Sequence, residues 1–246
     1  MEFDFIFQGG TVINGTKQFI SSGATADVAL IFGVTDPEAG KKGITAAIAL
    51  TSSSVYKVIS REKKLGQRAS DTCQLSFDGL EIPPEMILGE LGEGYRIALG
   101  NLEGGRIGIA AQALGIARAA YEAALDYAQE RESMGRPIIQ HQAVAFRLAD
   151  MATKIEVARQ MIWHAASVKD AGRPALKEAS MAKLYASEMA EEVCSAAIQI
   201  HGGAGYFQEA GVERIFRDAR VTTIYEGTSE VQRLLIARQL MAQYQV

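Results

Sequence analysis

The chain has 246 residues, carries 25 Lys and Arg against 29 Asp and Glu, and is 48% hydrophobic. This composition is ordinary for a globular protein and excludes an intrinsically disordered chain, which would combine fewer hydrophobic residues with a larger net charge. Two cysteines, Cys73 and Cys194, are too few for a disulfide scaffold, and we expect both to be buried free thiols. The sequence shows no metal-ligand spacing, no basic surplus typical of nucleic-acid binding, and no apolar run of the ~20 residues that a membrane-spanning helix needs.

The first part of the chain is predicted to form strands. Residues 27–34 and 44–50 are short apolar runs, and residues 74–77 alternate between polar and apolar. Dipeptides typical of turns separate these runs: Asn14-Gly15, Asp36-Pro37, Asp78-Gly79 and Pro83-Pro84. Because no helical pattern lies between the runs, a βαβ arrangement is disfavoured, and we expect a partial antiparallel β-barrel or sandwich.

After Gly94 the pattern becomes helical. Apolar residues recur at steps of three and four over 107–121, 146–162, 181–197 and 231–240, and the second of these stripes begins with Phe146 and Ala149. Segments rich in glycine and proline separate the stripes. The sequence therefore predicts an α+β protein with two segregated domains: the β-domain over residues 1–87 and an antiparallel four-helix bundle over residues 88–246.

Glu226 is the first candidate for chemistry. Ser229 followed by Gln232 has the spacing of a capping box, so the last helix should begin there, with Glu226 in the loop just before it. A loop carboxylate beside a glycine can point into a cleft and act as a general base. On spacing alone, an exposed acid without a function is the commoner outcome.

Three further segments carry candidate ligand-binding residues, although no nucleophile–base pair is recognisable. Residues 199–206 end a helix in adjacent glycines, which can bind phosphate through backbone N–H groups but more often cap a helix. Arg131 and Ser133 suit a pyrophosphate group, although an arginine at a helix end commonly opposes the helix dipole instead. The Gly104-Gly105 pair in a predicted helix costs about 1 kcal/mol per glycine relative to alanine, so we expect a ligand or another helix to pack closely there.

These four segments occur together and in order, and the combination resembles the acyl-CoA dehydrogenase family, within it the short-chain (butyryl-CoA) branch. The resemblance covers essentially the whole chain and rests on residues 225–233, 199–203, 131–135 with His141-Gln142, 105–117 and 17–22. It implies an FAD enzyme that oxidises an acyl-CoA thioester to the trans-2-enoyl-CoA. Glu226 would take the α-proton while the β-hydrogen leaves as hydride to flavin N5.

The resemblance also implies roles for other residues. Phe19, Ile20 and Ser21 would lie against the flavin ring, with Phe19 and Ser21 where the family often has Trp and Thr. Arg131 and Ser133 would hold the FAD pyrophosphate of a neighbouring subunit. The remaining residues implied to contact FAD are His141, Gln142, Gln199, Gly202, Gly203, Thr228 and Glu230, and those implied on the substrate side are Glu103, Arg106 and Gly227.

The implied partners are an acyl-CoA substrate, an electron-transfer flavoprotein and further copies of the chain in a homotetramer, a dimer of dimers. The implied location is the bacterial cytoplasm or the mitochondrial matrix. The family's N-terminal helical domain is not recognisable, and we expect this chain to begin inside the middle β-domain. Two alternatives stay open: a non-catalytic fragment or paralogue that binds CoA or a partner, and an acyl-CoA oxidase.

Overall fold

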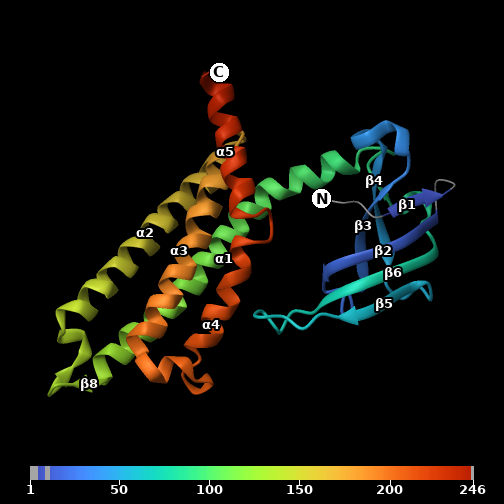
Figure 1. Cartoon of the computed structure of the whole chain (residues 1–246). Coiled ribbons are helices and arrows are strands. Elements are labelled where there is room, and N and C mark those ends of the chain that lie inside the picture. The colour runs from blue at the N-terminus through green and yellow to red at the C-terminus, as the bar shows by residue number, and fades with distance from the viewer. Residues whose placement is uncertain (1–4, 9–11, 245–246) are drawn as a thin grey trace. The chain divides into compact units, whose positions relative to one another are not determined.

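The computed structural model describes residues 5–8 and 12–244, and the chain forms two compact units, Met1–Asn101 and Leu102–Val246 (Figure 1). Strands make up the first unit and helices the second, which confirms the predicted α+β organisation. None of the helices within the described residues is both long and apolar enough to cross a membrane.

The first unit contains a seven-stranded sheet in the order β5-β6-β2-β1-β3-β4-β7. The β1–β3 pair is parallel and the other neighbours are antiparallel. The predicted runs 27–34, 44–50 and 74–77 lie in β3, β4 and β6, whereas none of these runs corresponds to β2, β5 or β7. The strands are β1 (Phe5–Gln8), β2 (Val12–Ser21), β3 (Val28–Val34), β4 (Ile44–Leu50), β5 (Tyr56–Arg61), β6 (Thr72–Glu81) and β7 (Ile87–Leu88).

The core of this sheet follows from side-chain alternation. In β6, Cys73, Leu75 and Phe77 point inward at every second residue and are buried. They pack with residues of neighbouring strands, and the Phe77 ring meets Tyr56 of β5 edge-on at 5.4 Å between ring centres. The predicted burial of Cys73 as a free thiol is confirmed, as is that of Cys194 in the helical unit.

Two of the predicted turns are wrong. Asn14-Gly15 lies within β2 and Asp78-Gly79 within β6, at a point where the pairing of the two strands shifts register. The backbone N–H of Gly79 donates to Oδ1 of Asn14 at 2.7 Å, and Gly79 has a φ of 72°. The residues that favour turns therefore form a β-bulge, which also needs a residue with positive φ. Asp36-Pro37 and Pro83-Pro84 do begin short 3-10 helices, η1 (Pro37–Gly43) and η2 (Pro84–Met86).

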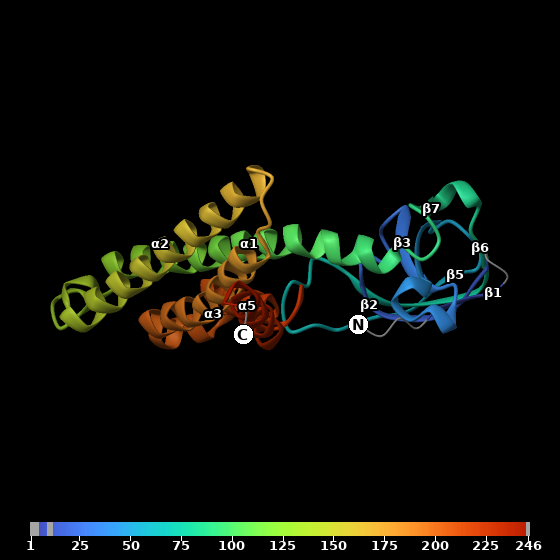
Figure 2. The same ribbon diagram turned by 90° about the horizontal axis from the view of Figure 1, so that it is seen from above.

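The second unit is a helical bundle in which α3 lies beside α2 and also beside α4 and α5 (Figures 1 and 2). The three long helices and the shorter last helix confirm the prediction, but α4 was not predicted. The helices are α1 (Gly94–Glu130), which begins in the first unit, α2 (Gln142–Asp170), α3 (Leu176–His201), α4 (Val212–Ala219) and α5 (Ser229–Tyr244). The connections contain β8 (Glu132–Ser133), β9 (Arg136–Pro137), η3 (Ile138–Gln140), η4 (Gly202–Tyr206), η5 (Gln208–Ala210) and η6 (Arg220–Thr223).

Small side chains form much of the bundle core. Alanines of α1 recur in the core at steps of three and four, from Ala110 to Ala128, and α3 supplies further buried alanines. Such small residues let helices approach closely. In α2 the predicted stripe is out of place at its start, since Phe146 and Ala149 are exposed and Leu148 and Met151 are buried instead. From Ile155 onward the predicted α2 stripe is confirmed.

Candidate active site

Glu226 lies in the loop between η6 and α5, as the sequence predicts, and the loop has an unusual backbone. Glu226 has a φ of 53°, a left-handed conformation uncommon for residues other than glycine, and Gly227 follows with a φ of 89°. A Cβ atom at residue 227 would also come within 2.8 Å of Nε2 of Gln232. Conformation and space therefore both require glycine after the glutamate.

Polar side chains hold this loop, and two of them, Lys183 and Gln232, are buried. The Nε2 group of Gln232 in α5 donates to the backbone oxygens of Glu226 (3.0 Å) and Gly227 (2.9 Å). The ammonium group of Lys183 in α3 donates to the same Gly227 oxygen at 2.8 Å. On the other side of Glu226, the Tyr225 hydroxyl donates to the Gln112 side chain of α1. The loop is thus fixed to three helices of its own unit.

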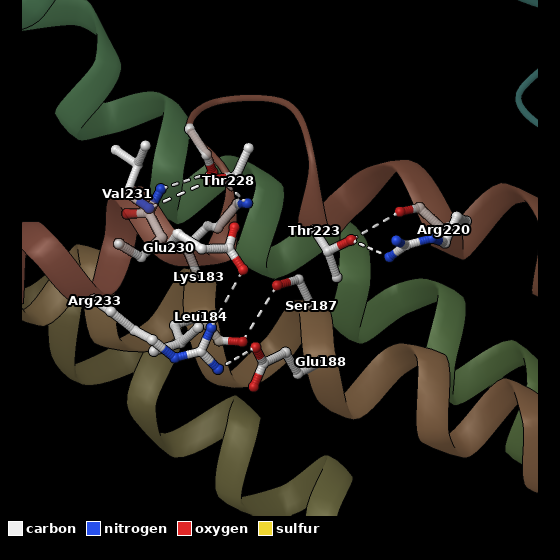
Figure 3. Close-up of polar contacts among 12 residues, drawn as sticks. Lys183, Leu184, Ser187, Glu188, Arg220, Thr223, Thr228, Glu230, Val231 and Arg233 are labelled. Atoms are coloured by element: carbon white, nitrogen blue, oxygen red, sulfur yellow. Dashed lines mark hydrogen bonds and ion pairs between the residues drawn. The ribbon is translucent and has the colours of Figure 1, made fainter.

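The predicted capping box is wrong, although α5 does begin at Ser229. The Oγ atom of Ser229 is buried and has no partner among the described residues, and Gln232 bonds to the preceding loop instead. Thr228 caps the helix, because its Oγ1 accepts from the backbone N–H of Val231 at 3.4 Å (Figure 3). The pKa of Glu230 is lowered by its own backbone N–H and by the Thr228 hydroxyl, so its carboxylate is stabilised at this helix start.

The Glu226 carboxylate lies against α1 at the predicted glycine pair. A Cβ atom on Gly105 would be 2.5 Å from Oε2 of Glu226, so the close packing expected at this glycine comes from the carboxylate itself. Beside it, Gly104 faces the end of Lys169 from α2, whose ammonium group lies 4.0 Å from Oε1 of Glu103. Because Gly105 has no side chain, α1 leaves room for the Glu226 carboxylate at this position.

Two buried cations accompany this carboxylate. Arg106 is 6% exposed, and its Nε has no hydrogen-bond partner in the part of the chain that the structure describes. Burial lowers the pKa of Arg106, while the charges of Glu226 and Glu103 oppose that shift. Burial likewise lowers the pKa of Lys183 to about 8, opposed chiefly by Glu226. The Glu226 carboxylate therefore lies within electrostatic range of two buried cations.

A second group of expected residues lies at the connection between α1 and α2. Arg131 and Ser133 are exposed, as is Gln142 at the start of α2. His141 ties the connection together, since its ring nitrogens lie 3.0 Å from the Ser133 oxygen and 3.3 Å from an Arg136 nitrogen. This exposed hairpin presents a guanidinium group, a hydroxyl and an amide to an outside ligand.

Glu226 and this connection are far apart within one chain. Arg131 follows Gly105 by 26 residues, almost all of them in α1, so ~39 Å of helix separates Arg131 from the carboxylate beside Gly105. The exposed Gln199, Gly202 and Gly203 end α3 and begin η4, and Gly202 has a φ of 58°. The structure therefore divides the expected residues of the helical unit into separate groups.

The remaining expected residues, Phe19, Ile20 and Ser21, end β2 in the first unit. Phe19 has a φ of 60° and is 71% exposed, so its ring stands out from the sheet. Asp71 anchors the turn that follows: its carboxylate accepts from the Ala24 backbone N–H and the Thr25 hydroxyl, both at 2.9 Å, and from the Cys73 thiol. These bonds, with Ala24 the largest contribution, lower the pKa of Asp71 to about 2.

A basic hollow that the sequence analysis missed lies beside this turn. It measures about 970 Å³ and is lined by the turn and by the segment that joins β5 to β6. Four cationic side chains line it, Arg61, Lys63, Lys64 and Arg68, together with the acidic Glu62 and Asp71. A cluster of cations within eight residues was visible in the sequence, but it has no spacing that indicates a ligand.

Comparison with known proteins identifies the family. The family model of the acyl-CoA dehydrogenase C-terminal domain matches residues 92–241, and that of the middle domain matches residues 6–80. The chain belongs to the acyl-CoA dehydrogenase family. It is 48% identical over 233 residues, or 95% of its length, both to an acyl-CoA dehydrogenase of Bacillus subtilis (strain 168) and to the human short-chain specific acyl-CoA dehydrogenase, mitochondrial. The structure of butyryl-CoA dehydrogenase from Megasphaera elsdenii matches 96% of the chain with a TM-score of 0.93 and 41% identity.

The match confirms the family expected from the motifs. The chain spans 62% of the Bacillus protein, 57% of the human protein and 62% of the Megasphaera chain. Sequence analysis placed Glu226 in the right loop but assigned Gln232 to a capping box and missed Lys183 and Asp71, and these three residues hold the two candidate segments in place. A signal for Lys183 was available, because this lysine lies four residues after Ala179 within an otherwise apolar stripe of α3.

Proposed function

We propose that this chain carries out FAD-dependent α,β-dehydrogenation of a short-chain acyl-CoA thioester to the trans-2-enoyl-CoA. The observation that carries the proposal is the Glu226 carboxylate, which a left-handed loop fixes against a glycine of α1 beside two buried cations. A solvated loop acid without a function would need none of these contacts. The similarity to short-chain and butyryl-CoA dehydrogenases supports the same reaction and the short acyl chain.

The residues expected to bind FAD suit that cofactor by their chemistry. Arg131 is exposed, so its guanidinium group is accessible to a pyrophosphate, with the Ser133 hydroxyl two residues later in the sequence. The exposed Phe19 ring offers a flat surface to an aromatic ligand. The proposed set is completed by Ile20, Ser21, His141, Gln142, Gln199, Gly202, Gly203, Thr228 and Glu230. Bound FAD would supply the acceptor for the hydride that leaves the β-carbon.

Glu226 would remove the α-proton of the substrate. Its backbone is held by the bonded loop and its carboxylate lies against Gly105 of α1, so the base would approach the substrate from one direction. As the proton leaves, negative charge grows on the thioester oxygen, and we propose the backbone N–H of Glu226 as a donor to it. Arg106 and Glu103 would lie on the substrate side, with Gly227 beside the thioester.

The separation within α1 supports an assembly of several copies. Because ~39 Å of helix lies between the Glu226 carboxylate and Arg131 of one chain, the two belong to different binding sites. We propose that each site combines Glu226 of one copy with Arg131 and Ser133 of another, in a homotetramer. We also propose an electron-transfer flavoprotein as electron acceptor, a location in the bacterial cytoplasm or mitochondrial matrix, and a domain division after residue 87.

The test is an absorbance spectrum of the purified 246-residue chain with added FAD, before and after anaerobic butyryl-CoA. The expected result is a bound flavin band that bleaches when the thioester is added. Glu226→Gln should keep the flavin band and bleach about 10²- to 10⁴-fold more slowly, the range that a general base contributes. Reoxidation by air as fast as by an electron-transfer flavoprotein would instead indicate an oxidase.

A chain that stays colourless after FAD is added and does not turn over butyryl-CoA would contradict the proposal for this polypeptide. Binding of CoA without bleaching would then favour the non-catalytic alternative.

A further inference from the structure

Lys183 is the largest side chain that is completely shielded from solvent among the described residues. It lies on α3 between the buried Ala182 and Ala186. An ammonium group at such a position costs free energy unless it is paired, and the lowering of its pKa to about 8 expresses that cost. The proton transfer proposed for Glu226 does not use this lysine, so its burial needs another explanation.

The explanation lies in what Lys183 and Gln232 contact. Lys183 donates to the Gly227 oxygen at 2.8 Å, and Gln232 donates to the oxygens of both Glu226 and Gly227 at 3.0 and 2.9 Å. Gln232 is fully buried as well. Its amide orientation is settled by the contacts, since the reversed amide would place Oε1 against two carbonyl oxygens. The two hydrogens of one amide group thus bond to two successive carbonyls.

These bonds fix the backbone around Glu226. Holding the Glu226 and Gly227 oxygens holds two successive peptide planes, and therefore both dihedral angles of Gly227. Before Glu226, the Tyr225 backbone N–H donates to the Val221 oxygen at 3.1 Å. A left-handed φ at a glutamate persists only where its surroundings determine it, and the loop meets that condition on both sides.

We propose that Lys183 and Gln232 are positioning residues, which hold the Glu226 and Gly227 carbonyls and thereby aim the Glu226 carboxylate. The catalytic consequence rests on the proposed function of Glu226, whereas the holding of the loop rests on the hydrogen bonds alone. The two parts therefore have separate tests.

The first test needs neither FAD nor substrate. Hydrogen–deuterium exchange by mass spectrometry is measured over residues 224–231 in the whole chain, for Lys183→Met and Gln232→Met. Each variant should exchange about 10- to 100-fold faster there, the factor expected for the loss of strong buried hydrogen bonds, with exchange in α2 unchanged. Lys183→Arg keeps the charge and a donor and should restore most of the protection.

Lys177→Met is the matched control, because Lys177 lies on the same helix but pairs with Glu178 at its partly exposed start. It should leave exchange over residues 224–231 unchanged. Wild-type exchange of this segment in both Lys183→Met and Gln232→Met overturns the inference. If circular dichroism shows that Lys183→Met does not fold, Gln232→Met decides by the same criterion.

The second test uses the FAD-loaded chain and butyryl-CoA. Both variants should lower kcat about 10-fold or more while KM changes by less than about 3-fold, because a misaimed base slows chemistry without removing a substrate contact. A raised KM at unchanged kcat overturns the positioning role. If the wild-type chain itself binds no FAD, the proposed function fails, and the exchange experiment still decides whether these residues hold the loop.

Discussion

Replacing Gly105 by alanine should separate the stability of the helical unit from its chemistry. A Cβ atom at residue 105 would lie 2.5 Å from Oε2 and 3.0 Å from Cδ of Glu226. Carbon and oxygen atoms without a bond between them need about 3.5 Å, so the carboxylate must move by about 1 Å. The obstructing atoms are the far end of a flexible side chain, which can turn aside while α1 stays in place.

The two effects of this substitution have opposite signs. Alanine in a helix interior is favoured over glycine by about 1 kcal/mol, so the free energy of unfolding should stay equal or rise by up to that amount. A displacement of about 1 Å at a reacting group can lower the rate by about 100-fold, which corresponds to roughly 2.7 kcal/mol in the transition state. We therefore expect a protein at least as stable as wild type with strongly reduced turnover.

Gly108→Ala provides the matched control. Gly108 lies on the same helix, and a Cβ atom there would meet nothing within 4 Å. It should gain the same helix stability and keep wild-type turnover. Denaturant unfolding followed by circular dichroism measures the stability, and the rate of anaerobic flavin bleaching by butyryl-CoA measures the chemistry. Equal bleaching rates in Gly105→Ala and Gly108→Ala would refute the conclusion that Gly105 reserves space for the carboxylate.

Three further predictions follow from other contacts. The pKa of Lys183 is lowered from 10.5 to about 8, so between these pH values the unfolded chain binds a proton that the folded chain does not. The free energy of unfolding of the wild type should therefore rise with pH over this window, by up to about 3 kcal/mol relative to that of Lys183→Met. Parallel denaturant titrations of the two proteins measure this difference. Asp71→Asn offers one acceptor oxygen where Asp71 uses two, so it should lower the Tm of the sheet unit. The pKa of Asp71 is about 2 against an ordinary 3.8. The loss of Tm caused by Asp71→Asn should therefore have its full size above pH 4 and become smaller as the pH falls toward 2. Gly43→Ala would place a Cβ atom 1.7 Å from the Asp36 backbone oxygen and should destabilise the sheet unit by about 3 kcal/mol or more, whereas a loss below about 1 kcal/mol would contradict the packing at this turn.

Periodicity predicted the elements that bury a continuous face. The long helices and the strands β4 and β6 have such faces, and they form where expected. The missed elements lack them: in β5 only Tyr56 is buried, and α4 buries only Val212 and Ala219 over two turns. Local rules also failed where distant contacts compete with them. Asn14-Gly15 has the composition of a turn, but its pairing with β6 makes it part of a bulge.

The site shows the same limit. The position of Glu226 before a helix start was predictable, because helix caps and loops depend on residues that are neighbours in the sequence. The contact from Lys183 to Gly227 spans 44 residues, and that spacing has no local signature. Gln232 illustrates the competition directly, since its amide could bond to its own helix start or to the carbonyls of the preceding loop. Sequence spacing favoured a bond to its own helix start. The left-handed backbone of residues 226 and 227 instead turns their carbonyl oxygens toward the Gln232 amide, which bonds to them.

The geometry also separates what one chain determines from what assembly would add. The direction of the Glu226 carboxylate depends on α1, α3, α5 and the loop, all within one unit of one copy. The proposed pyrophosphate ligands, Arg131 and Ser133, lie exposed at the other end of α1. If each FAD bridges two copies, its affinity depends on association while the orientation of the base does not. Dilution below the assembly threshold would then release flavin, whereas in the FAD-free protein the hydrogen exchange of residues 224–231 should not depend on chain concentration.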